Sequence, residues 1–390
     1  MDPTVEAIAS DLLDKITAHC RQRLKPDESE ALIAFAAHMA PHMTTDETEP
    51  RDPDDAYASL LSFWKFAGKR KSERALVRVY NPRLDEHGWN SPHTIVEMVN
   101  DDMPFLVDSV VSALNQNGHQ IHGLAHPVVE TARDADGNLC KPDENAITHR
   151  ESYIQIEIGS LSDPDALSAI RQTLSNTLDD VRVSVSDWPT MMDNARAIVR
   201  DLEENPPPLE GTEVAEGKAL LEWMIADHFT FLGYREYDYE ASQESERLEI
   251  VQGTGLGLLR SSERRVMNRH SGGPTLSPEV REFLQRPELV IVTKTNYRSP
   301  VHRPVHLDYI GIKRFDPKGD VVGERRFVGL FTSAAYNRTP REIPYLRRKA
   351  DRVLARAGFD RRGHAGKALV NVIDTYPRHE LFQVSEDELH

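Results

Sequence analysis

A six-residue turn, Asn100 to Phe105, separates two different periods of apolar residues. Before it, Thr94–Val99 reads Thr-Ile-Val-Glu-Met-Val, which predicts a buried strand. After it, the apolar positions between 106 and 118 recur every three or four residues, and Gly118 supplies the stop of a helix. We expect Asp101 or Asp102 to cap this helix, because a carboxylate can accept from its free N–H groups.

The segments around this turn follow the order β-α-β-β-α-β. They are a strand at 94–99, a helix at 106–118, strands at 120–129 and 153–158, a helix at 167–178 and a strand at 181–185, with a leading strand at 75–80. That order predicts a ferredoxin-like sandwich, in which an antiparallel sheet carries both helices on one face.

A second module follows a Pro-rich break. Asn205-Pro-Pro-Pro208 cannot continue the helix expected at 191–202, so it reads as a linker between domains. Beyond it the strand candidates are 229–234, 248–251, 289–293, 306–315 and 326–332. They predict a mainly antiparallel sheet, after which the helical period returns at Pro344 and a strand-like run occupies 381–384.

The length of 390 residues suggests two or three domains. We expect an α+β chain with helical amino-terminal and carboxy-terminal segments. The expected boundaries are a helical segment at 1–70, the ferredoxin-like domain at 75–190, a helix and linker at 191–213, the second sheet domain at 214–340, a helical segment at 341–380 and the start of a further domain at 381–390.

Composition restricts the partners. A formal charge of −16 repels phosphate backbones, which argues against nucleic acid. The apolar stretches fall short of the roughly 20 residues that span a bilayer, and the acidic amino terminus lacks a secretory signal, so we expect a soluble, cytoplasmic protein. Cys20 and Cys140 are too few for a disulfide framework, and we expect two reduced, buried thiols.

Basic residues are concentrated between 341 and 367. Arg347, Arg348, Arg352 and Arg356 form a candidate docking surface for an acidic partner or for another part of the same protein. The alternative is a solvated helix face.

Motifs for catalysis, cofactors and metals are incomplete. Gly253–Gly257 lacks the helix and the parallel unit of a dinucleotide loop, and 363–367 lacks the first glycine and the hydroxyl of a phosphate loop. The histidine groups are 119, 122 and 126, and 302 and 306; neither has the remaining ligands of a zinc site. No serine lies in a nucleophile elbow. We therefore assign no catalytic, cofactor-binding or metal residue.

The turn itself is the best candidate site. Free N–H groups and the positive end of the following helix can receive a carboxylate, such as that of an amino acid. Its residues are Asn100, Asp101, Asp102, Met103, Pro104 and Phe105. In the alternative interpretation the two aspartates only cap the helix, while Met103 and Phe105 pack beneath it.

The run Asp102–Ser109 resembles the strand-turn-helix signature of ACT domains, which bind small effectors. More specifically, the chain resembles the amino-terminal region of the large bacterial NAD-specific glutamate dehydrogenases over roughly 75–385. The further segments that carry this resemblance, in order, are 227–237, 255–260, 302–304, 308–315, 330–336 and 341–344.

The resemblance implies a multidomain enzyme that converts L-glutamate, NAD and water to 2-oxoglutarate, ammonia and NADH. It implies ACT-like and PAS-like modules here and a dehydrogenase domain elsewhere, so this chain is expected to be inactive alone and to hold no cofactor, whereas the full-length enzyme uses NAD. The implied role is regulation and assembly, with other domains and subunits of the same enzyme as partners in a homo-oligomer, and an amino acid as effector.

Two alternatives stay open. The chain could be a free-standing ACT-type amino-acid-binding protein that regulates a separate enzyme, or an enzyme in its own right. The turn also departs from the pattern of many amino-acid-binding ACT domains, which place a glycine just after the proline. Phe105 occupies that position here, which favours packing over ligand binding.

Overall fold

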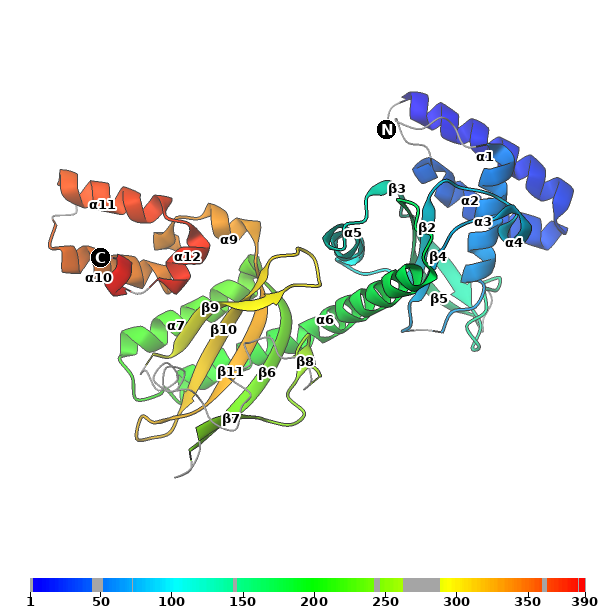
Figure 1. Cartoon of the computed structure of the whole chain (residues 1–390). Coiled ribbons are helices and arrows are strands. Elements are labelled where there is room, and N and C mark those ends of the chain that lie inside the picture. The colour runs from blue at the N-terminus through cyan, green and yellow to red at the C-terminus, as the bar shows by residue number, and fades with distance from the viewer. Residues whose placement is uncertain are drawn as a thin grey trace. The chain divides into compact units, whose positions relative to one another are not determined.

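The computed structural model describes residues 3–43, 52–71, 73–142, 146–241, 246–261, 288–359, 363–384 and 386–389. The chain divides into two compact units, which are described separately (Figure 1). The first unit comprises Met1–Arg182 and Pro300–Arg303, and the second comprises Val183–Ser299 and Pro304–His390.

Helices cover one face of the sheet in the first unit (Figure 1). They are α1 (Pro3–Arg23), α2 (Pro26–Met43) and α3 (Pro53–Ala67), followed by the short α4 (Leu84–His87). Asp52 is the N-cap of α3, and its Oδ1 accepts from the backbone N–H of Asp54 at 2.8 Å. The apolar sides of these helices form one core with Val99, Ala125 and Tyr153 of the sheet.

The sheet of the first unit is antiparallel. Its strands are β1 (Leu76–Tyr80), β2 (Thr94–Asp101), β3 (Ile121–Ala125), β4 (Val128–Arg133) and β5 (Ile147–Ile158), with α5 (Leu106–Gln116) between β2 and β3. The strand order is β1-β2-β5-β3, and β4 pairs with the first half of β5. Strand β5 therefore lies between β2 and the edge formed by β3 and β4, as expected for a ferredoxin-like sheet.

The strand predicted at 181–185 is wrong, because these residues lie inside the 41-residue helix α6 (Pro164–Glu204). Val181, Ser184 and Asp187 are buried at a spacing of three, which is the period of a helix rather than a strand. The strand that pairs with β2 opposite β5 is β1, from the segment predicted as the leading strand at 75–80. The same helix contains the separate helix predicted at 191–202.

A buried carboxylate ties three segments of the first unit together. Glu151 on β5 is fully buried and accepts hydrogen bonds from Arg70 Nη2 at 2.6 Å and Arg133 Nε at 2.7 Å. Burial raises the pKa of Glu151, but hydrogen bonds and charge from Arg133 and Arg70 outweigh it and hold the pKa below its usual range. The carboxylate is therefore ionised and paired in the folded chain.

The second unit contains a six-stranded antiparallel sheet. Helix α7 (Gly211–Trp223) and the helical turn η1 (Met224–His228) lead into it. Its strands are β6 (Phe229–Ala241), β7 (Glu246–Ile250), β8 (Leu256–Gly257), β9 (Val290–Arg298), β10 (His306–Phe315) and β11 (Val321–Phe331). The order is β7-β6-β11-β10-β9, with β8 paired to β6. One face of this sheet packs on the second half of α6 and on α7.

Helices complete the second unit. They are α9 (Ser333–Asn337), η3 (Pro340–Glu342), α10 (Leu346–Ala357), α11 (His364–Thr375), α12 (Arg378–Gln383) and α13 (Glu386–Leu389). The strand-like run predicted at 381–384 is wrong, because most of it lies in α12. Leu381 and Phe382 are buried from this helix, and the Phe382 ring stacks on Phe331 with centroids 4.8 Å apart.

The two cysteines differ in burial. Cys20 is buried in the helical core of the first unit, whereas Cys140 is exposed, so the prediction of two buried thiols is wrong for Cys140. The pattern of apolar residues could not predict this difference, because Cys140 follows a turn and does not belong to a helix or strand with an apolar face.

Replacing Glu151 by Gln should lower the free energy of unfolding by about 3–5 kcal/mol, because two buried guanidinium groups lose their common carboxylate. Chemical unfolding followed by circular dichroism measures this loss. The matched control is Glu130→Gln on β4, an exposed site of the same sheet, for which we expect less than about 0.5 kcal/mol.

The same variant tests the ionisation of Glu151. Because its folded pKa is depressed, its stabilisation is complete above the unfolded value of about 4.3 and is lost as pH falls through the folded value. Glu151→Gln should therefore lose less stability than the parent chain on acidification below about pH 4.3. Equal acid sensitivity would contradict a paired, ionised Glu151.

Candidate functional site

The predicted turn joins β2 to α5, but its aspartates do not cap the helix. Asp101 Oδ1 accepts from Arg70 at 2.5 Å and Asp101 Oδ2 from Arg182 Nη1 at 2.6 Å. Burial raises the pKa of Asp101, but the hydrogen bonds from Arg70 and Arg182 outweigh this effect. The pKa of Asp101 therefore lies below its usual range. The prediction that Asp101 caps α5 is wrong, because its carboxylate is held by arginines.

Asp102 also points to other partners. Its Oδ1 accepts from the Ser152 hydroxyl at 2.9 Å, and its Oδ2 lies 3.3 Å from Arg150 Nη2. Asn100 is buried and contacts Arg182 through its side-chain oxygen. The polar side chains at 100–102 therefore face the strands and α6, and the prediction that Asp102 caps α5 is wrong as well.

Phe105 occupies the N-cap position of α5 with a left-handed backbone, φ +72° and ψ +1°. This conformation costs a residue with a Cβ about 1–2 kcal/mol and favours glycine. Phe105 thus adopts the backbone that a glycine would provide at this position. Met103 and Phe105 are both half-buried, and Pro104 is exposed.

Residues 300–303, which belong to the same unit, lie against the start of α5. The backbone N–H of His302 donates to Ser109 Oγ at 2.9 Å, and its Nδ1 lies 3.1 Å from Asp108 Oδ2. The rings of Phe105 and His302 are 4.9 Å apart, and His302 also has a positive φ of 67°. An effector at the turn would therefore have to fit beside His302 or replace it.

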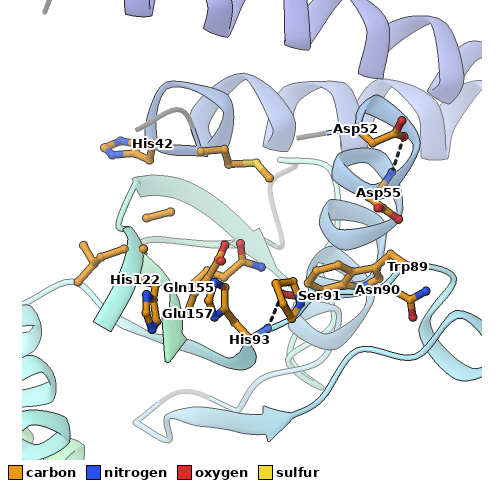
Figure 2. A pocket seen from close by; sticks show the side chains of 15 residues that line it. His42, Asp52, Asp55, Trp89, Asn90, Ser91, His93, His122, Gln155 and Glu157 are labelled. Carbon is orange, nitrogen blue, oxygen red and sulfur yellow. Dashed lines mark hydrogen bonds between the residues drawn. The ribbon is translucent and has the colours of Figure 1, made fainter. Parts of the chain in front are cut away.

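A cavity of about 310 Å³ lies on the other face of the sheet, beside α2 and α3 (Figure 2). Its floor is the second half of β5, where Gln155 and Glu157 share the face of Tyr153. Its walls are the C-terminal end of α2, the start of α3 and the segment Trp89–His93. This volume is at the small end of the range typical of small-molecule sites.

Sequence reasoning missed this cavity, although β5 contained a signal for it. Ile154, Ile156 and Ile158 were predicted to share one face, which leaves Gln155 and Glu157 on the opposite face. Polar residues on a strand face that helices cover indicate either a hydrogen-bonded cluster or a site. Gln155 Nε2 donates to Glu97 Oε1 at 3.0 Å, so a hydrogen-bonded cluster lies at the floor of this cavity.

The predicted docking surface on α10 meets α7 of the same unit. Arg347 Nη2 lies 2.6 Å from Glu216, and Arg348 contacts Glu213 through its guanidinium group. Arg352 lies 3.7 Å from Glu210, and Arg356 is exposed on the same helix. Three of the four arginines therefore contact acidic residues at α7. The sequence had left open a separate acidic partner or another part of the same protein, and these contacts are of the second kind.

The histidines singled out in the sequence lie among the described residues. Within the described ranges, no group of three or more His, Cys, Asp or Glu side chains is arranged to hold a metal ion. His122 instead stacks on His93, with ring centroids 4.3 Å apart and planes 17° apart. In the part of the chain that the structure describes, no helix has both the length and the apolar character needed to cross a membrane.

Comparison with known sequences agrees with this architecture. Residues 35–174 match the family "Glutamate dehydrogenase, ACT1 domain", and residues 343–390 match "Glutamate dehydrogenase, helical motif 1". The first match extends from α2 into α6 and includes the sheet, the turn and the cavity. The second match covers α10 to α13.

Three NAD-specific glutamate dehydrogenases are similar to this chain. The protein of Halomonas elongata is 38% identical over 384 residues, 97% of this chain and 24% of the relative. That of Pseudomonas aeruginosa is 34% identical over 389 residues, 98% of this chain and 24% of the relative. That of Mycobacterium tuberculosis is 25% identical over 338 residues, 85% of this chain and 19% of the relative. The chain spans about a quarter of the length of the first two relatives.

Phe105→Gly and Phe105→Ala both remove the ring, but only glycine relieves the left-handed backbone. We expect the glycine variant to be about 1 kcal/mol more stable than the alanine variant in chemical unfolding. The control is Val111 inside α5, where the order should reverse, because glycine disfavours a helix interior by about 1 kcal/mol. Equal stability of the two Phe105 variants would contradict the assigned conformation.

Arg348→Met should lower the free energy of unfolding by about 1.5–3 kcal/mol, because Glu213 loses a charged hydrogen-bond partner in a half-buried site. Methionine keeps the aliphatic stem, so the loss reports the guanidinium group. Arg352→Met, at a more exposed position of the same helix, should cost less than about 0.5 kcal/mol. Thermal unfolding of both variants checks this, and equal losses would argue against a specific α7 contact.

Proposed function

Because the chain belongs, as an amino-terminal region, to the NAD-specific glutamate dehydrogenase family, we propose that it is a non-catalytic regulatory and assembly segment of such an enzyme. The observation that carries this proposal is the ACT1 match at 35–174, which includes the whole antiparallel sheet of the first unit. ACT domains are effector-binding modules, and their sheets associate with one another or with neighbouring domains.

The second unit is proposed to be a PAS-like module. Its sheet places β6 and β11, the first and last strands, side by side at the centre, with β7 and β9 at the edges. This arrangement is typical of PAS-type sheets. We assign no catalytic role to the described residues of this unit, and we propose a role in sensing or assembly for it.

The activity proposed for the full-length enzyme is oxidation of L-glutamate to 2-oxoglutarate and ammonia with NAD in the cytoplasm. The relatives' names supply the enzyme and its cofactor, and no residue of this chain is assigned to that chemistry. The proposed partners of the chain are other domains and subunits of the same enzyme. We therefore propose a homo-oligomer, in which each subunit contributes a copy of this segment to the contacts between subunits.

The proposed effector site is the turn Asn100–Phe105 at the start of α5. Its polar side chains are fixed by Arg70, Arg150 and Arg182, so the backbone, rather than the aspartates, would receive a ligand carboxylate. The rings of Phe105 and His302, which lie 4.9 Å apart, restrict the space for a ligand at the start of α5. An amino acid would therefore bind there beside His302 or in its place.

A second candidate function is that of a free-standing ACT-type protein that binds an amino acid and regulates a separate enzyme. The same turn supports it. Reading the gene beyond the codon for His390 separates the two: a continuing dehydrogenase sequence eliminates the free-standing protein, and a stop codon favours it.

The purified chain should form no NADH from L-glutamate and NAD, measured by absorbance, because we assign no catalytic role to its described residues. NADH formation would overturn the non-catalytic role. Light scattering should give a particle mass above one copy of the chain, and a strict monomer would argue against assembly.

Titration calorimetry with a panel of amino acids tests sensing at the turn. We expect heat with at least one amino acid and loss of that heat in Asp102→Ala, because Asp102 holds the turn in place through Ser152 and Arg150. Asp85→Ala, an exposed aspartate on α4, is the control and should leave the heat unchanged. No heat with any amino acid would leave only the assembly role.

A further inference from the structure

The second sheet buries charged side chains on the face opposite α6 and α7. Strand β11 lies between β6 and β10 in this sheet (Figure 1). Phe327 of β11 belongs to the core that includes residues of α6 and α7, so the adjacent Arg326, and with it Glu324, point to the other face. Glu324 is 1% exposed and Arg326 is 7% exposed. Charged groups that are buried this far require partners.

Glu324 has one carboxylate oxygen without a hydrogen-bond partner. Its Oε1 accepts from the Tyr309 hydroxyl and lies 3.3 Å from Arg326 Nε. Its Oε2 is buried and, within the described chain, no donor reaches it, not even Lys313, which stands opposite Glu324 on β10. Gly311 leaves space for this carboxylate, because a Cβ there would lie 2.6 Å from Oε1. A ligand that donates to Oε2 would therefore meet an acceptor that is already held in place.

Arg326 offers the complementary donors. Its Nε donates to the Tyr309 hydroxyl at 3.0 Å, and its guanidinium group lies 3.9 Å from the centre of the Tyr237 ring. Among the described residues, no acceptor lies within hydrogen-bond distance of Nη1 or Nη2. Burial lowers the pKa of Arg326, but Tyr309 and Glu324 raise it by more, so the group is charged. Two adjacent NH2 groups on a planar cation are the arrangement that binds a carboxylate.

A second buried arginine makes the charge beside Arg326 positive. Arg235 stands opposite Arg326 on β6, is 2% exposed, and donates through Nη2 to the carbonyl oxygens of Leu259 and Ser261. Carbonyl oxygens satisfy these N–H groups but do not neutralise the charge. Arg235 and Arg326 thus bring two positive charges, and Glu324 brings one negative charge. The acid group of a ligand would lower the electrostatic free energy of this arrangement.

The two unsatisfied groups select a ligand with two charges. An anion alone would leave Glu324 Oε2 unpaired, and an amine alone would leave the NH2 groups of Arg326 unpaired. We propose that Arg326 and Glu324 form a binding site on the second sheet for a small zwitterion with a carboxylate next to an ammonium group, as in an α-amino acid. The carboxylate accepts from Arg326, and the ammonium group donates to Glu324 Oε2. The site depends neither on the turn at 100–105 nor on the chain being part of a dehydrogenase.

Titration calorimetry of the whole chain carrying Asp102→Ala tests the proposal, because this background removes the contribution of the turn. The probes are the L-amino acids, each with two truncated counterparts: the acid that lacks the amino group and the amine that lacks the carboxylate. We expect saturable binding of at least one amino acid and binding weaker by about tenfold or more for both counterparts, since each loses a charge-assisted hydrogen bond. No binding by any amino acid, or equal binding of either counterpart, would overturn the proposal.

Variants in the same background locate the site. Glu324→Gln keeps an acceptor for Tyr309 and places an NH2 group where Oε2 was, so it should weaken the amino acid by about tenfold or more. Arg326→Lys keeps the charge but loses the planar pair of donors, and we expect a similar loss of affinity. Glu222→Gln makes the same charge change at an exposed position of α7 and should leave the affinity unchanged. Circular dichroism checks that each variant is folded.

The two sites fail independently in this design. Heat that Asp102→Ala removes from the unmodified chain belongs to the turn, and its absence there would count against sensing at the turn alone. Heat that remains in Asp102→Ala and is lost on adding Glu324→Gln belongs to the second sheet. Unchanged affinity in both Glu324→Gln and Arg326→Lys would contradict the proposed site, whatever the turn does.

Discussion

The arrangement of the first unit depends on the burial of one charge. Glu151 lies in the first half of β5, and its carboxylate is stabilised there because Arg70, after α3, and Arg133, at the end of β4, both donate to it, as does the Tyr153 hydroxyl. Desolvating an ion costs several kcal/mol, so the three segments must close together around it. The backbone at Gly137 shows how close this approach is, since a Cβ there would lie 2.3 Å from the Arg70 carbonyl oxygen.

Periodicity predicted most of the strands and helices, and it failed where a segment carried two periods. Val181, Val183 and Val185 alternate as a strand would, but Ser184 and Asp187 are buried with Val181 in a helix. β-Branched residues only weakly oppose a helix, and the packing of α6 outweighs that preference. The run at 381–384 was too short for its period to decide between strand and helix.

The candidate turn could be placed from the sequence, but the direction of its side chains could not. Asp101 and Asp102 have the spacing of helix caps, and the arginines that hold them come from distant parts of the chain. The acidic partner of the α10 arginines was equally remote, on α7. Phe105 stands where many amino-acid-binding ACT domains have a glycine. Its backbone is left-handed, which is the conformation that a glycine adopts without steric cost.

The origin of the edge strand decides where this module can be divided. Strand β1 precedes the turn in the chain and pairs along the edge of β2 opposite β5. A shortened chain that began at Thr94 would keep the turn and α5, yet it would leave the N–H and C=O groups along β2 open to pairing between molecules. For anyone who expresses the domain alone, its workable start therefore lies upstream of Leu76.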